Sequence, residues 1–153
     1  MLIRTFVLVF SVFSIFLFGG CVRNNDVFIL GQFESEIDIK AKNTEYKGTV
    51  FFNGIDSTRF VFSSPEALEG ISVTSNSSGT KYAVGDTEYS TQEGDNALFL
   101  LNNVLMDMKN KTICIDSVNS LSTNDEAYEV VIDESGTNVS IVSGQYQYSF
   151  CVV

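Results

Sequence analysis

The sequence contains no histidine, so the side chains left as candidates for chemistry are its three cysteines and its nineteen carboxylates. Without an imidazole, neither a Ser-His-Asp triad nor a Cys-His pair can form, and zinc sites with histidine ligands are excluded. The acidic pairs Asp125-Glu126 and Asp133-Glu134 fit solvated loop and turn residues, because a glycosidase would need a cleft rich in aromatic platforms. Asp86 and Glu88 could offer oxygens to calcium, but no calcium-loop consensus surrounds them. We therefore expect no catalytic activity, no cofactor and no metal site.

Cys21 has the most informative surroundings, because it directly follows an apolar run and the pair Gly19-Gly20. A charged start at Arg4, an apolar core over 6–18 and small residues before the cut are the three parts of a secretory signal. The apolar run is shorter than the roughly 20 residues that a membrane-spanning helix needs, which favours cleavage over permanent anchoring. The alternative is an ordinary signal peptide, cut after Gly20, with a cysteine that happens to follow.

The segment Leu17-Phe18-Gly19-Gly20-Cys21 resembles the lipobox of bacterial lipoproteins, with Phe18 where leucine is usual. The resemblance implies that Cys21 receives a diacylglyceryl thioether and becomes the mature N-terminus. The implied location is the extracytoplasmic side of the cell membrane, held by the lipid. We expect residues 1–20 to be the signal peptide, 21–27 a short tether with the lipidated cysteine, and 28–153 a single β-rich domain.

The mature chain is strongly acidic, because removing residues 1–20 removes Arg4 and none of the nineteen acidic residues. Such a surface repels nucleic acid and anionic headgroups. We therefore predict no nucleic-acid partner, and attachment to the membrane through the N-terminal lipid rather than through a basic patch.

Cys114 and Cys151 form a candidate disulfide, because an exported protein can keep such a bond and Cys21 would carry lipid. Strict alternation over 112–116 places Cys114 opposite Ile113 and Ile115, and Cys151 likewise lies opposite Phe150. Both thiols would then project from the polar faces of their strands, where a bridge between neighbouring strands is possible. The alternative is that they are two isolated small residues.

Alternating hydrophobicity predicts short strands from residue 28 onward, joined by Asn-Gly, Gly-Asp and Ser-Gly turns. The expected strands are Glu34–Lys42, Glu45–Asn53, Thr58–Ser63, Ile71–Thr74, Lys81–Val84, Thr87–Thr91, Thr112–Val118, Ala127–Asp133, Val139–Ser143 and Gln145–Val153. Ser64, Pro65 and Gly70 bound one short helical turn.

The exception to this alternation is Asn96–Lys109, which predicts one helix capped by Asp95. Its broad apolar arc must cover a sheet, and a narrow polar stripe lies opposite: Asn96, Asn103, Asp107 and Asn110. Phe99 and Met106 fall outside the arc. They are either ordinary overhang of the core or the edge of an apolar groove.

Three segments occur in a characteristic order: Tyr46-Lys47-Gly48, then Phe60-Val61-Phe62-Ser63-Ser64-Pro65-Glu66-Ala67-Leu68-Glu69-Gly70, and later Ile132-Asp133-Glu134-Ser135-Gly136. With these segments the chain resembles small clostridial-type lipoproteins whose mature domain is similar to the lipoprotein carriers LolA and LolB. This resemblance implies a mainly β (α+β) fold, an antiparallel, strongly curved sheet or incomplete barrel with one covering helix. It also implies an apolar cavity for acyl chains.

These observations lead to two functional hypotheses for a non-catalytic lipoprotein. The first is that an apolar or amphipathic ligand, such as an acyl chain, binds in a groove between sheet and helix lined by Phe60, Phe62, Phe99 and Met106. The second is an envelope protein-interaction or structural module whose exposed sheet edges recruit a partner. A continuous apolar cavity of several hundred Å³ would favour the first hypothesis, and a filled core the second.

Overall fold

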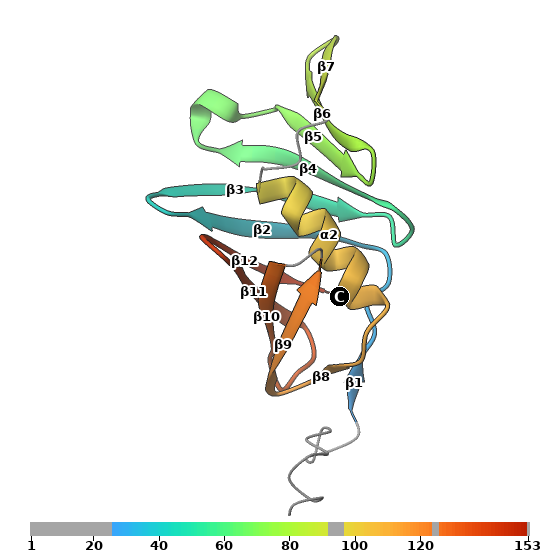
Figure 1. Ribbon diagram of the computed structural model, residues 1–153. Coiled ribbons are helices and arrows are strands. Elements are labelled where there is room, and N and C mark those ends of the chain that lie inside the picture. Colours follow the sequence, from blue (N-terminus) through green and yellow to red (C-terminus); the bar gives the residue numbers. More distant parts are fainter. Residues whose placement is uncertain (1–25, 92–96, 124–125, 153) are drawn as a thin grey trace, which may run out of the picture.

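The computed structural model describes residues 26–91, 97–123 and 126–152 (Figure 1). Its strands are β1 (Val27–Phe28), β2 (Phe33–Ala41), β3 (Thr44–Phe52), β4 (Ser57–Ser64), β5 (Ser72–Asn76), β6 (Gly79–Val84), β7 (Thr87–Thr91), β8 (Ile113–Cys114), β9 (Ser117–Thr123), β10 (Glu126–Ile132), β11 (Asn138–Ser143) and β12 (Tyr146–Cys151). The described helical elements are the short 3₁₀ turn η1 (Glu66–Leu68) and the helix α2 (Ala97–Lys109).

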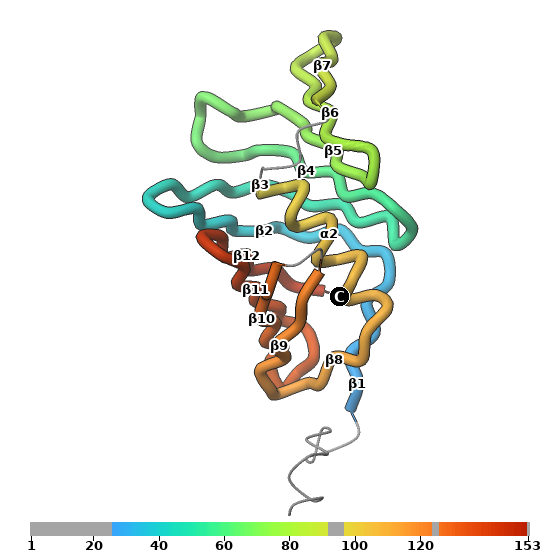
Figure 2. Tube along the Cα trace, in the orientation of Figure 1, coloured from blue at the N-terminus to red at the C-terminus, as the bar shows by residue number. Residues whose placement is uncertain are grey.

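Ten strands form one antiparallel sheet in the order β7-β6-β5-β4-β3-β2-β12-β11-β10-β9, and β1 pairs with β8 in a separate two-stranded sheet. The large sheet stays open, because its two ends do not pair with each other. It bends around α2, which contacts β4 and β5 in one half and β9 in the other (Figures 1 and 2). The predicted antiparallel, incompletely closed sheet with one covering helix is therefore confirmed.

Alternation along the strands decides which face of the sheet meets the helix. On β2, Ile37 and Ile39 are buried, while Glu36 and Lys40 are exposed. Their partners on β12 follow the same rule, because Phe150 lies opposite Ile37 and Tyr148 opposite Ile39. The apolar residues of β2 and β12 thus lie together on the buried face of the sheet, as period-two patterning requires.

Gly48 on β3 lets the ring of Phe60 lie flat over the neighbouring backbone. A Cβ built at Gly48 would lie 2.2 Å from the carbonyl oxygen of Val61 and 2.6 Å from Cζ of Phe60. The register between β3 and β4 shifts at Lys47/Gly48, as at a β-bulge. A glycine is needed here because no side chain fits beneath the ring.

The prediction of one continuous strand over Thr112–Val118 was wrong. The chain instead turns after β8, at Asp116, which has a φ of 53° and breaks the extended conformation. β8 pairs with β1, whereas β9 pairs with β10. The side-chain amide of Asn119 on β9 links this strand to β8. Its Oδ1 accepts a hydrogen bond from the Cys114 N–H at 2.8 Å, and its Nδ2 donates one to the Cys114 carbonyl at 2.9 Å.

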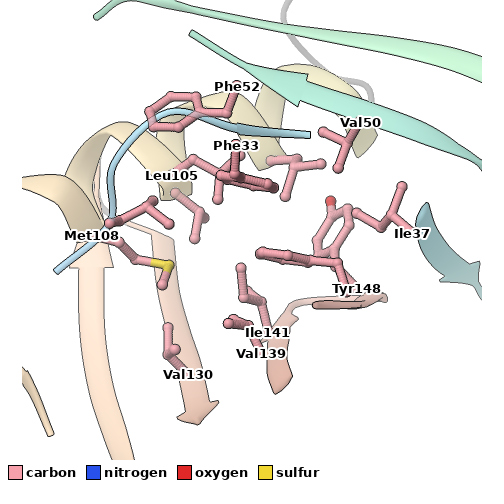
Figure 3. Close-up of a cluster of buried hydrophobic side chains, with 14 of the residues drawn as sticks. Phe33, Ile37, Val50, Phe52, Leu105, Met108, Val130, Val139, Ile141 and Tyr148 are labelled. Carbon is pink, nitrogen blue, oxygen red and sulfur yellow. The ribbon is translucent and has the colours of Figure 1, made fainter. Parts of the chain in front are cut away.

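The interior between α2 and the sheet is filled by aliphatic and aromatic side chains. Figure 3 shows Phe33, Val50 and Phe52 meeting Leu105 and Met108 of the helix, with Tyr148 and Ile141 completing the cluster. Phe33 stacks on Phe150 with ring centroids 5.2 Å apart. Within the described residues, no helix has the length and apolar character needed to cross a membrane.

Candidate functional site

Helix α2 positions the candidate site, because one side of the helix is buried against the sheet and the other side is half-buried or exposed. Its buried residues are Leu98, Leu101, Asn102, Val104, Leu105 and Met108. Phe99 and Met106 are half-buried, so both lie at the border of the core rather than inside it. They are seven residues apart, which corresponds to about 10 Å along the helix axis.

A row of buried polar groups lies beneath the helix. Thr58 of β4 donates a 2.8 Å hydrogen bond to Oδ1 of Asn102, and both side chains are almost fully buried. The row continues across the sheet, since Thr58 pairs with Ser75 and Ser75 with Thr80, whose hydroxyl groups are 3.2 Å apart. Sequence analysis missed Asn102. The available signal was its position three residues before Leu105 and four after Leu98, inside the apolar arc.

A hollow of about 360 Å³ opens beside the polar stripe of the helix. The β3–β4 loop, the β5–β6 turn and the end of β9 converge on it from three directions. Its lining residues are Asp56, Ser77, Asn102, Asn103, Met106, Asp107, Asn110 and Thr123. The hollow therefore combines amide, hydroxyl and carboxylate groups with one flexible apolar side chain, that of Met106.

Asp107 fixes the helix to the far end of the sheet. Its Oδ2 accepts a hydrogen bond from the Tyr128 hydroxyl at 2.5 Å and lies 2.6 Å from Nζ of Lys111. Lys111 also donates to the carbonyl oxygen of Ser122 on β9 at 2.8 Å. Burial, together with the hydrogen bond to the Asp107 carboxylate and its charge, raises the pKa of Tyr128 well above its ordinary value. The pKa of Tyr148 is raised by burial and by the nearby Tyr146 and Glu126.

The raised pKa values of Tyr128 and Tyr148 predict a loss of stability at alkaline pH. An unfolded tyrosine ionises near pH 10, whereas Tyr128 stays protonated in the fold, so above about pH 10 the folded state binds more protons than the unfolded state. The free energy of unfolding should then fall by up to about 1.4 kcal/mol per pH unit for each such group. Tyr128→Phe should make this slope shallower in urea unfolding curves measured between about pH 9 and pH 11. An unchanged slope would show that Tyr128 ionises in the folded state.

Of the four residues of the predicted groove, the described structure places Met106 at the hollow beside α2. Phe60 is fully buried and meets the half-buried Phe62 edge-on, with ring centroids 4.6 Å apart, and Tyr46 lies against Phe62 at 5.9 Å. Met106 lines the hollow beside α2, but Phe60, Phe62 and Phe99 are not among its lining residues. Phe60 thus belongs to the core of the sheet.

A bridge between Cys114 and Cys151 is absent, so this prediction was wrong for the structure described. Cys151 is a free, exposed thiol that donates to Oδ1 of Asn138 at 2.9 Å, whereas Cys114 is disulfide-bonded. The physical reason lies in the topology. β8 carries Cys114 into the small sheet with β1, whereas β12 carries Cys151 between β2 and β11 of the large sheet. The two cysteines therefore do not stand on neighbouring strands.

A second hollow, of about 470 Å³, lies on the sheet face opposite α2. Its lining mixes polar groups such as Glu36, Asp38 and Asp133 with the apolar residues Val131, Val139 and Phe150, and it includes Cys151. Hydrogen bonds from Asn138, Ser135 and Thr137 lower the pKa of Asp133 to about 2. No group of three or more metal-ligating side chains occurs among the described residues.

Comparison with known proteins adds one remote likeness. No family model matches the chain, and no curated protein matches it. Among solved structures, the chain is similar to a LolA superfamily protein from Nitrosomonas europaea, at 9% identity and a TM-score of 0.43, over 82% of this chain and 86% of that one. A likeness this remote assigns neither a family nor a function.

Proposed function

We propose that the chain is a lipid-anchored, extracytoplasmic, non-catalytic protein whose domain binds an amphipathic ligand between α2 and the sheet. The anchoring part of the proposal rests on the lipobox-like segment that ends at Cys21. The binding part rests on one observation, the hollow of about 360 Å³ that adjoins the helix–sheet core at Met106. The resemblance to lipoprotein carriers noted from the sequence points in the same direction.

Met106 supplies the apolar side of the hollow. It is half-buried and lies next to Leu105, which is fully buried in the core. An unbranched thioether side chain changes rotamer readily and adapts to an inserted alkyl chain. An acyl chain entering here would contact Met106 first and could then extend along the border between helix and sheet.

The polar side of the hollow favours a neutral or cationic headgroup. Its lining includes two carboxylates, Asp56 and Asp107, and no basic side chain. The neighbouring lysines already have partners, since Lys109 donates to the Gly54 carbonyl and Lys111 is bound to Asp107 and Ser122. The amides of Asn103 and Asn110 can both donate and accept hydrogen bonds, which suits hydroxyl groups.

The test uses a soluble form that lacks residues 1–21 and a pyrene-labelled monoacylglycerol as the probe. We expect micromolar binding and about tenfold weaker binding for Met106→Asp, because a carboxylate replaces the apolar contact. Val118→Asp is the matched control, since Val118 is exposed on the sheet face turned away from α2. The thermal midpoint of each variant should be measured alongside. Absence of probe uptake, or equal weakening by both variants, would contradict the proposal.

The interaction module remains the second candidate function, because the described core is densely filled. Phe52, Phe60, Leu101, Leu105 and Tyr148 are almost fully buried, and Figure 3 shows their neighbours packed between helix and sheet. A chain that binds no acyl probe would keep this core closed and act through its surface.

A further inference from the structure

Four consecutive apolar residues, at positions 27–30, stand at the start of the described domain. Phe28 and Leu30 are buried, whereas Val27 is 45% exposed and Ile29 is 82% exposed. Ile29 is the most exposed large apolar side chain that the structure describes. A strand with water on one face should alternate apolar with polar residues, as β2 does. This segment instead has an apolar face in the core and a second apolar face outside it.

The segment is held in a defined place by the pairing of β1 with β8. Phe28 lies opposite Ile113, which is fully buried. The backbone N–H of Ile115 donates to the Asp26 carbonyl at 3.3 Å. In Figure 1, β1 lies at the bottom of the molecule and the β6–β7 hairpin at the top. The two outward aliphatic side chains therefore belong to one end of the domain.

The proposed lipid at Cys21 limits how far this end can lie from a membrane. Asp26 is five residues beyond Cys21. An extended chain spans at most about 3.6 Å per residue, so Asp26 lies within about 18 Å of the lipid-bearing residue. A connection this short keeps Val27 and Ile29 at a high effective concentration beside the bilayer, and a small apolar contact then suffices for docking.

We propose that Val27 and Ile29 dock on the lipid surface that anchors the chain and insert at the boundary between headgroups and acyl chains. This inference rests on the proposed lipid anchor. The length of the tether selects the occupant, because the anchor brings a bilayer to this end of every copy. Aliphatic side chains at that boundary leave water, and the gain grows with the apolar area they bury. Docking orients the domain with β1 toward the bilayer and the β6–β7 hairpin away from it.

The charges beside the apolar pair favour a zwitterionic lipid surface. Asp26 is exposed, and so is Asp116, which follows the Ile115 that bonds to Asp26. The whole chain also carries a formal net charge of −10. Carboxylates repel anionic headgroups but attract the ammonium groups of phosphatidylcholine. Phosphatidylcholine is therefore the lipid for the test.

The chain contains no tryptophan, so one introduced indole can report on membrane contact. Ile29→Trp is purified from its own membranes and reconstituted into phosphatidylcholine vesicles whose acyl chains carry bromine near the headgroup. Its emission should shift to shorter wavelength and be largely quenched by the bromine. Tyr89→Trp is the matched control, because Tyr89 is 69% exposed on β7, and its emission should not change. Equal quenching of both variants, or none of Ile29→Trp, would overturn the proposal.

Flotation of the vesicles separates this inference from the anchor on which it rests. Fluorescence is read only from protein that floats with the vesicles. Protein that floats while Ile29→Trp keeps its emission contradicts docking and leaves the anchor intact. Protein that does not float contradicts the anchor, and docking through the anchor is then excluded as well.

The second experiment tests the aliphatic side chain itself, because an indole favours membrane interfaces on its own. Val27→Trp is the reporter, and adding Ile29→Asp should restore most of its emission, since a carboxylate opposes insertion. Val84→Asp is the matched control, because Val84 is 56% exposed on the distant hairpin and its replacement should leave the quenching unchanged. Ile29→Ser replaces Ile29→Asp should the latter lower the thermal midpoint. Quenching that persists without Ile29 would overturn the proposal.

Discussion

Phe60→Ala is expected to lower the free energy of unfolding by about 3–5 kcal/mol, because it empties a fully buried aromatic site in the centre of the sheet. The ring lies over Gly48 and against Phe62, and no neighbouring side chain can fill the space without moving. Equilibrium unfolding in urea measures the change from the transition midpoint. A loss this large is a substantial part of the stability of a typical single domain.

Phe62→Ala is the matched control, since Phe62 has the same side chain two residues away on the same face but is only half-buried. It should cost clearly less than Phe60→Ala, because part of its surface is already in contact with solvent. Measuring both stability and probe binding also shows whether Phe60 is a core residue or part of a ligand groove. A Phe60→Ala protein that kept its stability but lost binding of the acyl probe would return Phe60 to a ligand groove.

Much of the fold follows from local pattern. The alternation of Ile37 and Ile39 with charged neighbours predicts β2 and its buried face, and the 3.6-residue period predicts α2 to within one residue at its start and at its end. The turn at Gly85-Asp86 is equally local, because two residues decide its geometry. Such features need no knowledge of which strands are neighbours.

The errors concern properties that depend on the whole topology. Thr112–Val118 has an alternating pattern, yet Asp116 takes a left-handed conformation so that β9 can pair with β10. Cys114 lies on β8 in the small sheet with β1, and the following strand β9 is separated from β12 by β10 and β11, so the proposed bridge to Cys151 does not form. Alternation describes a strand's two faces but not its partner, and a disulfide depends on the partner.

The candidate site likewise combines residues that local sequence predicts with residues that only the topology brings together. The polar stripe of Asn103, Asp107 and Asn110 could be predicted from helical spacing, and the structure places all three at the hollow beside α2. Asp56 and Ser77 could not be predicted, because they reach the hollow from two separate turns. A pocket formed by converging loops depends on sheet curvature, which local sequence does not encode.

Cys21→Ala is expected to move the protein from the membrane fraction to the soluble fraction and to abolish fatty-acid labelling. Two acyl chains on one thioether-linked glycerol provide stable anchoring, whereas the acidic mature chain has no electrostatic attraction to anionic lipids. Loss of the thiol at residue 21 therefore leaves nothing of comparable strength to retain the chain.

Cys151→Ala is the matched control for this prediction, because Cys151 is an exposed free thiol that could be acylated to a thioester. Labelled palmitate followed by membrane fractionation should show full labelling and retention for Cys151→Ala, and neither for Cys21→Ala. Retention of label in Cys21→Ala would disprove lipidation at this residue. Soluble but unlabelled wild-type protein would instead favour an ordinary signal peptide cut after Gly20, since that outcome removes the lipid while keeping export.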